Sequence, residues 1–414
     1  MVGAHRGDER LSVTGRPRHP RPVAMLVHAY YEEDPRVRRE AESLVRAGRP
    51  VDVFALRRPD DPGESVLEGV RVHHLGVQRH QGASLPVYLG EYLDFFVRAA
   101  WAVSRAHARR RYALVQVHSL PDFLAFAALP LRAAGVPTLL DLHEAMPEFF
   151  RSRFPRAANP LTYRALLLQE RLSVAAATHV ITVNEPLAQR LRDLGAPAAK
   201  VSVVINSPSL LRFDPSRHPR RAFAEDGTVR LVYAGALTPT YEVDVAVEAV
   251  ARLRERRPDL DLALDLYGRG DSEAALRDLV ARRVLDGRVT FHGRIPLDEV
   301  PAAVARADIG LAPTRRDEFT DVTISGKIFE YGAMGKPVLA SRLPLVEATF
   351  PDGAVRTYAP GDPDGFAEEL ERLVDDAGSR EASLAQAGAV IRTLAWEREA
   401  ERYIALVDRL ARGR

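Results

Sequence analysis

Short hydrophobic runs alternate with helical stretches along the first half of the chain. The stretch 34–48 has a helical pattern, with Asp34 as the expected N-cap, Pro35 in the first turn and Gly48 after the last turn. The alternation of strand and helix predicts a parallel sheet with helices on both faces. The predicted strands of this half are 23–31, 50–56, 113–119, 137–144, 178–185 and 201–208.

The same alternation begins again in the second half. A polar, proline-containing stretch at 206–227 separates the two halves and suits a linker. An amphipathic stretch around 395–410, which contains Trp396, follows the second set of strands. The fold class predicted is therefore α/β, with two Rossmann-like parallel sheets whose carboxyl-end crevices face each other. The second set comprises strands at 229–235, 261–268, 289–293, 308–314 and 337–341, and helices at 243–257, 272–283, 297–306 and about 326–334.

Composition narrows the function classes. With 414 residues, 46% of them hydrophobic, the chain can bury two cores, and a net charge of +2 gives no field that would recruit nucleic acid. The chain has no cysteine, which excludes disulfides, thiolate catalysis and cysteine-ligated metals. Residues 1–21 are polar and basic, and we expect a disordered tail there, or one that touches anionic lipid or acidic partners. No apolar run is long enough to span a bilayer, so the expected location is the cytoplasm, including the inner face of the membrane.

Lysine is rare and unevenly placed. Only three of the 58 basic residues are lysines, and Lys327 and Lys336 both lie in SGKIFEYGAMGKPVLAS, at 325–341. A helix that starts near Gly326 offers unsatisfied amides to a phosphate, and a bound anion would favour Lys327 in its first turn. Glu330, one turn on, could accept ribose hydroxyls. The alternative is an ordinary surface pair between Lys327 and Glu330.

A second group of candidates follows the predicted strands of the first half. In DLHEAMPE, at 141–148, His143 and Glu144 lie among further carboxylates, which would be costly to bury unless they are paired or face a cleft. His118 ends another apolar strand, either as a functional group or as a strand cap. The sequence contains neither Asp-x-Asp nor histidines at metal-ligand spacing, so we expect no metal site.

Several segments carry a family resemblance. The stretch 325–341 resembles the donor-binding signature of the retaining family 4 glycosyltransferases, which have the GT-B fold, and LVYAGAL at 231–237 and the stretch 289–314 agree with it. The resemblance covers about 22–408. It implies a C-terminal helix that crosses back to the first domain. The expected division is an acceptor-side domain at 22–206, a linker at 207–228, a nucleotide-sugar domain at 229–393 and the crossing helix at 394–414.

The resemblance also implies roles for individual residues. Glu330 matches the second glutamate of the Glu-x(7)-Glu motif, which holds the donor ribose. His118 and His143, with Glu144 beside them, fall where the acceptor and the transferred sugar meet. The donor positions implied are Gly235 for close backbone approach, the amides of Ile324, Ser325 and Gly326 for the diphosphate, and Gly293, Arg294 and Ile295 for the base.

Three positions depart from the family pattern. The first motif glutamate falls at Val322, with Asp321 as the nearest substitute, and the usual basic pair falls at Ala236 and Tyr241. The Gly-Gly loop after the first strand is replaced by AYYEEDPRVRR, at 29–39. The cations expected to meet the diphosphate are Lys327 with Arg315 or Arg316, and Arg36 and Arg39 are expected to face the phosphate or an acidic acceptor.

The function predicted is retaining transfer of a sugar from a nucleotide-diphosphate-sugar donor, without a metal cofactor, to a small-molecule, saccharide or lipid-linked acceptor. The alternatives are a catalytically silent GT-B module that binds a nucleotide sugar or a partner, and a GT-B sugar-nucleotide epimerase. The stretch 85–111 carries a stripe of large apolar residues, read either as core or as a membrane-surface helix. The stripe comprises Tyr88, Tyr92, Phe96 and Val103.

Overall fold

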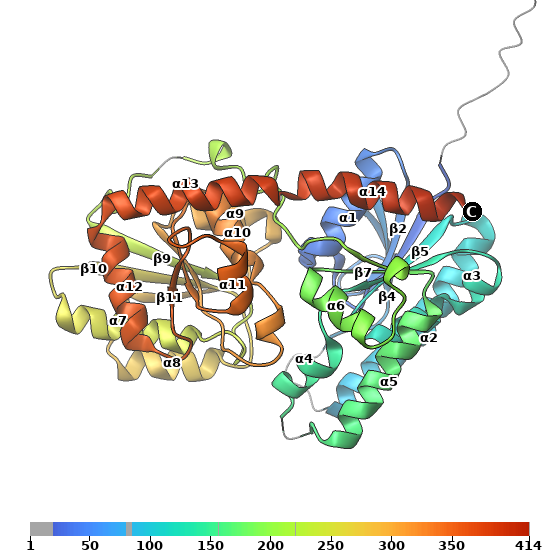
Figure 1. Cartoon of the computed structure of the whole chain (residues 1–414), viewed down its shortest axis with the longest axis horizontal. Coiled ribbons are helices and arrows are strands. Elements are labelled where there is room, and N and C mark those ends of the chain that lie inside the picture. Colours follow the sequence, from blue (N-terminus) through green and yellow to red (C-terminus); the bar gives the residue numbers. More distant parts are fainter. Residues whose placement is uncertain (1–19, 80–84, 156, 220, 414) are drawn as a thin grey trace, which may run out of the picture.

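The computed structural model describes residues 20–79, 85–155, 157–219 and 221–413, which form two α/β domains (Figure 1). The first domain contains an eight-stranded sheet of order β3-β4-β2-β1-β5-β6-β7-β8. All neighbours are parallel except β3 and β4, an antiparallel edge hairpin that the hydrophobic pattern did not predict. Its strands are β1 (Val23–Leu26), β2 (Val51–Leu56), β3 (Glu64–Leu67), β4 (Val70–Leu75), β5 (Leu114–His118), β6 (Thr138–Leu142), β7 (His179–Thr182) and β8 (Val201–Val203).

Helices cover both faces of this sheet. The predicted helix after β1 is α1 (Pro35–Arg46), and the Asp34 side chain accepts from the amides of Arg36 and Val37, as expected of its N-cap. It shares one apolar core with α14 (Trp396–Arg412). The opposite core is covered by α2 (Leu85–Arg110), the 3-10 turn η2 (Asp122–Ala128), α3 (Leu129–Ala133), α5 (Pro160–Ala176) and α6 (Glu185–Asp193), while α4 (Met146–Arg153) extends toward the second domain.

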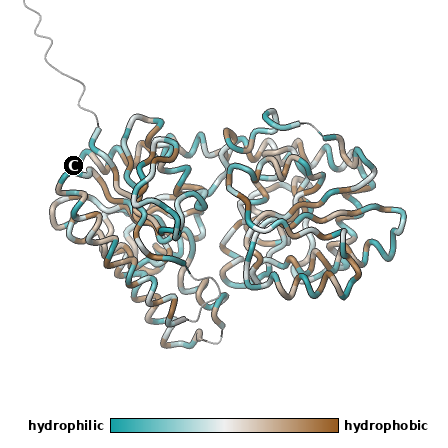
Figure 2. Tube along the Cα trace, turned by 180° about the vertical axis from the view of Figure 1, so that it is seen from behind, coloured by the Kyte–Doolittle hydropathy of each residue, from teal (hydrophilic) through white to brown (hydrophobic). Residues whose placement is uncertain are grey.

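The second domain has a six-stranded, fully parallel sheet of order β11-β10-β9-β12-β13-β14. Hydrophobic segments run through the middle of both domains (Figure 2). The strands of the second sheet are β9 (Thr228–Ala234), β10 (Asp261–Tyr267), β11 (Val289–Gly293), β12 (Ile309–Ala312), β13 (Val338–Ser341) and β14 (Arg356–Tyr358). The helices are α7 (Val243–Arg256), α8 (Glu273–Arg282), α9 (Val300–Ala305), α10 (Gly326–Ala333), α11 (Pro344–Thr349), α12 (Pro363–Asp375) and α13 (Ala377–Thr393).

The C-terminal helix crosses back to the first domain, as predicted. Helices α13 and α14 run along both domains (Figure 1), and the Trp396 indole donates to Ser43 Oγ of α1 at 2.9 Å. Tyr403 is fully buried in the core between α14 and the first sheet. The last helix therefore belongs to the packing of the first domain.

Two sequence predictions need correction or restriction. Most of the predicted tail, residues 1–19, lies outside the described residues, but Arg21 donates to the backbone oxygens of Arg111 and Tyr112, so the ordered chain begins before residue 22. The predicted stripe of α2 faces inward, since Val103 is fully buried and Tyr92 packs edge-on against His28, with ring centroids 4.7 Å apart. The stripe is therefore core, as one of the two interpretations expected, and these four side chains do not form an outward face. Within the described residues, no helix combines the length and apolar character needed to cross a membrane.

Candidate active site

The start of α10 presents unsatisfied amides. Ser325 is its N-cap with extended backbone, and its side chain makes no capping bond. Among the described residues, the amides of Ile324, Ser325 and Gly326 have no hydrogen-bond acceptor. Amides at a helix N-terminus carry partial positive charge and bind anions. This loop therefore has the geometry of a phosphate site.

Lys327 lies directly over Gly235, which follows β9. A Cβ atom at position 235 would overlap the Cε atom of Lys327, so only glycine leaves room for the lysine. The ammonium lies 4.0 Å from the ring centroid of Tyr241 and 5.2 Å from that of Tyr233. Rings at this distance hold a cation by their negative faces. Tyr241 stands where the family usually has a basic residue, and its ring stabilises the ammonium of Lys327.

The two rare lysines have different surroundings. Lys336 donates to the backbone oxygen of Ala305, the last residue of α9, at 2.9 Å. Lys327 forms no ion pair with any carboxylate of the described chain closer than 4.0 Å. Lys336 is therefore structural, and Lys327 keeps its charge available for a ligand.

Glu330 lies on α10 in an electropositive corner between the domains. Burial raises the pKa of its carboxyl, and the charges of Arg39, Lys327 and Arg212 oppose that rise. Arg39 is buried, and its guanidinium donates to Asn206 and lies 5.6 Å from the ring centroid of Trp396. The first domain therefore contributes a cation near the carboxylate expected to hold the ribose.

In the first domain, Asp141 is the centre of a buried ionic cluster. Arg36 donates to both of its oxygens, at 2.7 and 2.9 Å. Two imidazole nitrogens approach Oδ2: His118 Nδ1 at 3.1 Å and His143 Nε2 at 3.0 Å. His118 and Asp141 are fully buried, whereas the side chain of His143 is 17% exposed. His143 is thus the member of the cluster that can reach a ligand.

The pKa values of the two histidines move in opposite directions. Burial favours the neutral form of both, and it dominates at His118, whose pKa is lowered despite the hydrogen bond to Asp141. At His143 the Asp141 carboxylate outweighs burial and raises the pKa. Burial would raise the pKa of Asp141 itself, but Arg36 and the imidazoles hold it well below its ordinary value. Two groups with divergent pKa values at one carboxylate suit proton and charge chemistry.

The cluster continues through the protein to the crossing helix. Arg36 lies 3.2 Å from Glu40, whose other oxygen accepts from Gln116. The Gln116 oxygen accepts in turn from the Tyr403 hydroxyl at 2.6 Å. Burial raises the pKa of Glu40 to about 8, with Asp141 adding to the rise. A buried polar chain therefore connects α14 to the edge of the crevice.

Contacts between the domains place the Asp141 cluster and the start of α10 on opposite sides of the crevice. Asn184 donates to the backbone oxygen of Val322 at 2.9 Å, beside the phosphate loop. Ser152 of α4 donates to Asp317 at 2.6 Å, and Phe149 packs edge-on against Phe319. The predicted arrangement of two domains across a cleft is therefore confirmed.

Comparison with known proteins agrees with this architecture. Residues 34–207 match the family described as glycosyl transferase 4-like domain, and residues 228–376 match glycosyl transferases group 1. The chain belongs to the family 4 glycosyltransferases. It is 26% identical to D-inositol 3-phosphate glycosyltransferase of Pseudarthrobacter chlorophenolicus, covering 90% of each chain. It is also 26% identical to alpha-D-kanosaminyltransferase of Streptomyces kanamyceticus, covering 83% of this chain and 91% of the relative.

Solved structures establish the fold of this glycosyltransferase as GT-B. Sucrose-phosphate synthase of Thermosynechococcus elongatus superposes with a TM-score of 0.75 at 19% identity, covering 94% of this chain and 99% of the other. WaaG, a glycosyltransferase of lipopolysaccharide biosynthesis, gives 0.68 at 15% identity, covering 93% and 99%. At these identities the likeness concerns the fold alone.

Some residues predicted for the donor site are engaged elsewhere. Arg316 pairs with Asp321 at 2.9 Å, so the expected phosphate cation and the expected substitute carboxylate neutralise each other. Arg294, expected beside the base, pairs with Glu33 of the first domain at 2.6 Å. Gly293 has a φ of 68°, a backbone conformation that favours glycine. The side chain of Arg315 is exposed.

The remaining predictions lie near the site with altered roles. Ile295 packs partly against the apolar core of the second domain. Glu144 is partly buried, and burial raises the pKa of its carboxyl against the charges of His143 and Arg79. Arg36, expected to face a phosphate or an acidic acceptor, is instead 2% exposed and bound to Asp141. That correction follows from the cost of a buried guanidinium, which requires a carboxylate partner.

Sequence reasoning placed Asp141 beside His143 as a neighbouring carboxylate, but it did not predict that Arg36 and His118 also bind this carboxylate. The ligand atoms of His118, Asp141 and His143 lie within 4.8 Å of one another, close enough to surround a metal ion. Arg36 already neutralises both oxygens of Asp141, which favours a hydrogen-bonded cluster over a cation site.

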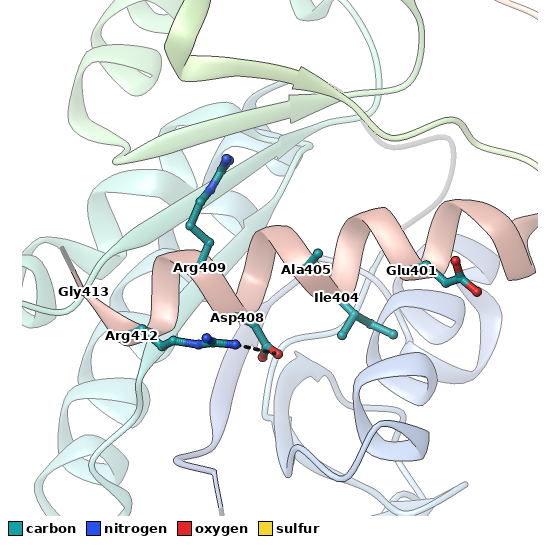
Figure 3. Close-up of a pocket in the computed structure, with 7 residues that line it drawn as sticks. All are labelled: Glu401, Ile404, Ala405, Asp408, Arg409, Arg412 and Gly413. Carbon is teal, nitrogen blue, oxygen red and sulfur yellow. Dashed lines mark ion pairs between the residues drawn. The ribbon is translucent and has the colours of Figure 1, made fainter.

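One surface hollow lies away from this chemistry. It has a volume of about 750 Å³ and runs along α14, lined by Glu401, Ile404, Ala405, Asp408, Arg409, Arg412 and Gly413 (Figure 3). Asp408 pairs with Arg412 at 3.8 Å and with Arg49 at 2.6 Å. All the lining residues come from one helix end, and none is close to the crevice residues of either sheet.

Proposed function

We propose that this glycosyltransferase moves a sugar from a nucleotide-diphosphate-sugar donor to a hydroxyl acceptor with retention of anomeric configuration. The observation that carries the proposal is the start of α10, where three amides have no acceptor among the described residues and the Lys327 side chain lies against Gly235. Such a cationic loop suits a diphosphate. The solved structure of HepE from Anabaena with UDP-glucose, which shares this fold, supports the donor class.

The chemistry would be mainly electrostatic. The bond between the anomeric carbon and the diphosphate oxygen breaks, the acceptor oxygen bonds to that carbon from the same face, and the acceptor proton passes to the leaving phosphate oxygen. The α10 amides and Lys327 would stabilise the negative charge that grows on the diphosphate. Glu330 would accept the ribose hydroxyls, and His143, protonated beside Asp141, would donate to a hydroxyl of the transferred sugar.

We further propose that the reaction occurs in the cytoplasm. We also propose that it needs no metal ion, because Lys327 and the α10 amides supply the positive charge. The names of the curated relatives, which include D-inositol 3-phosphate and kanosaminyl transfer, support a polar small-molecule or saccharide acceptor. Turnover that persists in EDTA is the expected result. Loss of turnover in EDTA, restored by a divalent cation, would contradict the metal-free mechanism.

A thermal-shift screen of nucleotide sugars tests the donor, because a ligand that binds only the folded state raises the melting temperature. NMR of the product then gives the anomeric configuration, and an inverted product would refute retention. Ala236 and Tyr241 stand where a basic pair is usual, which favours a silent binding module as the second candidate. That module would bind the donor but neither hydrolyse nor transfer it.

A further inference from the structure

The outer faces of α2 and α5 carry most of the exposed apolar surface of the chain. Of the twelve large hydrophobic side chains that stand exposed on the described residues, eight belong to these two helices. On α2, Leu89, Leu93, Val97 and Trp101 are spaced four residues apart, which places them in one stripe of about 18 Å. On α5, Leu161, Leu168 and Leu172 share a face, with Leu161 77% exposed.

Both stripes point away from the same side of the first sheet. Phe95, Ala99 and Val103 of α2 and Val174 of α5 pack into one apolar core beneath them, together with η2. Figures 1 and 2 show these helices on the side of the domain opposite α1 and α14. We call the exposed stripes of α2 and α5 the outer apolar face. Both helices pack on η2, and a large exposed apolar patch on a monomeric protein usually has a binding role.

The charges on this face are almost all positive. The exposed arginines are Arg98, Arg105 and Arg109 on α2 and Arg164 and Arg171 on α5. Asp94 is the one exposed carboxylate on the described outer faces of the two helices, and it pairs with Arg98 at 2.7 Å. Trp101 lies under the guanidinium of Arg105, 5.5 Å from the ring centroid. Apolar residues with interspersed arginines and a tryptophan are typical of a helix that lies at the surface of an anionic membrane.

We propose that the outer apolar face docks this glycosyltransferase on an anionic lipid bilayer. A second copy fits less well, because a twofold dimer through this face would oppose arginines to arginines with no carboxylates to pair them. Anionic headgroups would neutralise each of them. The N-terminal half of α2 also adjoins the crevice, since Tyr92 contacts His28 and Tyr88 contacts Phe154. The inference goes beyond the transfer reaction and does not depend on it.

Co-sedimentation with vesicles tests the proposal, using phosphatidylcholine alone and an equal mixture of phosphatidylcholine and phosphatidylglycerol. We expect binding to the mixed vesicles only, weakened by salt. Leu93→Glu should reduce the partition coefficient about tenfold or more, by removing apolar contact and adding a repelled charge. Arg105→Gln should reduce it about fivefold, the equivalent of one basic residue near an anionic surface. The control is Val284→Glu, at an exposed valine of the second domain, which should bind as the wild type does.

Melting temperature and nucleotide-diphosphate affinity, measured on each variant, separate a docking defect from misfolding. Equal binding of wild type and Leu93→Glu to the mixed vesicles would overturn the proposal, as would equal binding of wild type to both vesicle types. Light scattering gives the oligomeric state. A wild-type dimer that ignores vesicles and becomes a monomer in Leu93→Glu would also overturn it, by assigning the face to a second copy.

Discussion

The two crevice edges of this glycosyltransferase are built in opposite ways. In the first domain, Asp141 is saturated by Arg36 and two imidazoles, all within hydrogen-bond distance. In the second domain, the amides that begin α10 have no acceptor in the described chain, and Lys327 has no carboxylate partner there. A saturated cluster fixes side-chain positions before any ligand arrives, whereas an unsatisfied one gains its partners from the ligand. The first edge is therefore suited to positioning, and the second to binding an anion.

Removing the centre of the saturated cluster should have the largest effect. Asp141→Asn would remove the carboxylate that accepts twice from the buried Arg36 and leave Glu40, 3.2 Å away, as the carboxylate still beside it. Breaking a buried ion pair in this way typically costs about 3–5 kcal/mol of unfolding free energy. Chemical denaturation measures this directly. Asp265→Asn is the control, since within the described residues Asp265 forms an ion pair with the partly exposed His292 alone, and it should change stability by about 1 kcal/mol at most. A variant at 141 as stable as the control would mean that Glu40 alone compensates the charge of Arg36.

His143→Ala should separate the reaction from donor binding. Because His143 is the partly exposed member of the cluster, we expect transfer to fall by about 100-fold or more, and nucleotide-diphosphate affinity to stay unchanged. Calorimetric titration, melting and turnover on the same variant give the answer. If nucleotide affinity and stability fall together with turnover, His143 is a packing residue, and the first-domain edge of the crevice takes no part in the reaction through it.

The unsatisfied edge is tested by its lysine. Lys327→Ala should lower kcat by about 100-fold to 1,000-fold, because its charge acts on the departing diphosphate. Lys336→Ala is a matched control, since it removes the other lysine of the same segment, which only caps Ala305. We expect that control to cost about 1 kcal/mol of stability and to leave kcat within about twofold. A kcat for Lys327→Ala within that same range would reduce Lys327 to a structural role.

The fold was predictable because buried parallel strands have short continuous apolar sequences, as in β1 and β12. The hairpin β3–β4 was missed because its edge strand is largely exposed and polar. The α10 loop was predictable from local sequence, since Gly326, Lys327 and Glu330 are neighbours along one helix. The pairing of Asp141 with Arg36 was not, because the two residues are 105 positions apart in sequence.

The departures from the family pattern show a second limit of sequence reasoning. The family pattern indicates that a cation is missing at position 241, yet the Tyr241 ring contacts the ammonium of Lys327 at 4.0 Å from its centroid. Arg316 and Asp321 were each assigned a separate ligand role, but they pair with each other. A side chain's availability depends on its spatial partners, which a motif does not contain.

Stability should depend on pH through the buried chain behind the saturated cluster. The pKa of Glu40 rises to about 8 in the folded state from an ordinary 4.5, so the folded state holds a proton that the unfolded state releases. Stability therefore falls as pH rises between these two values, by up to about 1.4 kcal/mol per pH unit for one proton. The lowered pKa of His118 has the opposite effect, since it makes stability rise with pH, but only below the ordinary pKa of histidine. Denaturation should therefore be measured between about pH 7 and 8. The raised pKa of His143 acts in the same direction above its ordinary value, so Glu40→Gln should reduce the slope without abolishing it. An unchanged slope would assign the whole trend to His143 or another group.

The smallest effect expected is that of Glu330→Gln, which sharpens the binding role of the second edge. A carboxylate can accept from two ribose hydroxyls, whereas an amide keeps only one acceptor, so nucleotide-diphosphate affinity should weaken about tenfold. Stability should change little, because burial already disfavours the charged carboxyl. A 2′,3′-dideoxy nucleotide diphosphate completes a double cycle with the variant. The missing hydroxyls should weaken binding to the wild type more than binding to the variant, whose amide oxygen can accept from one hydroxyl only. Equal losses on both proteins would place the ribose away from Glu330, and the electropositive corner around it would then hold some other part of the donor.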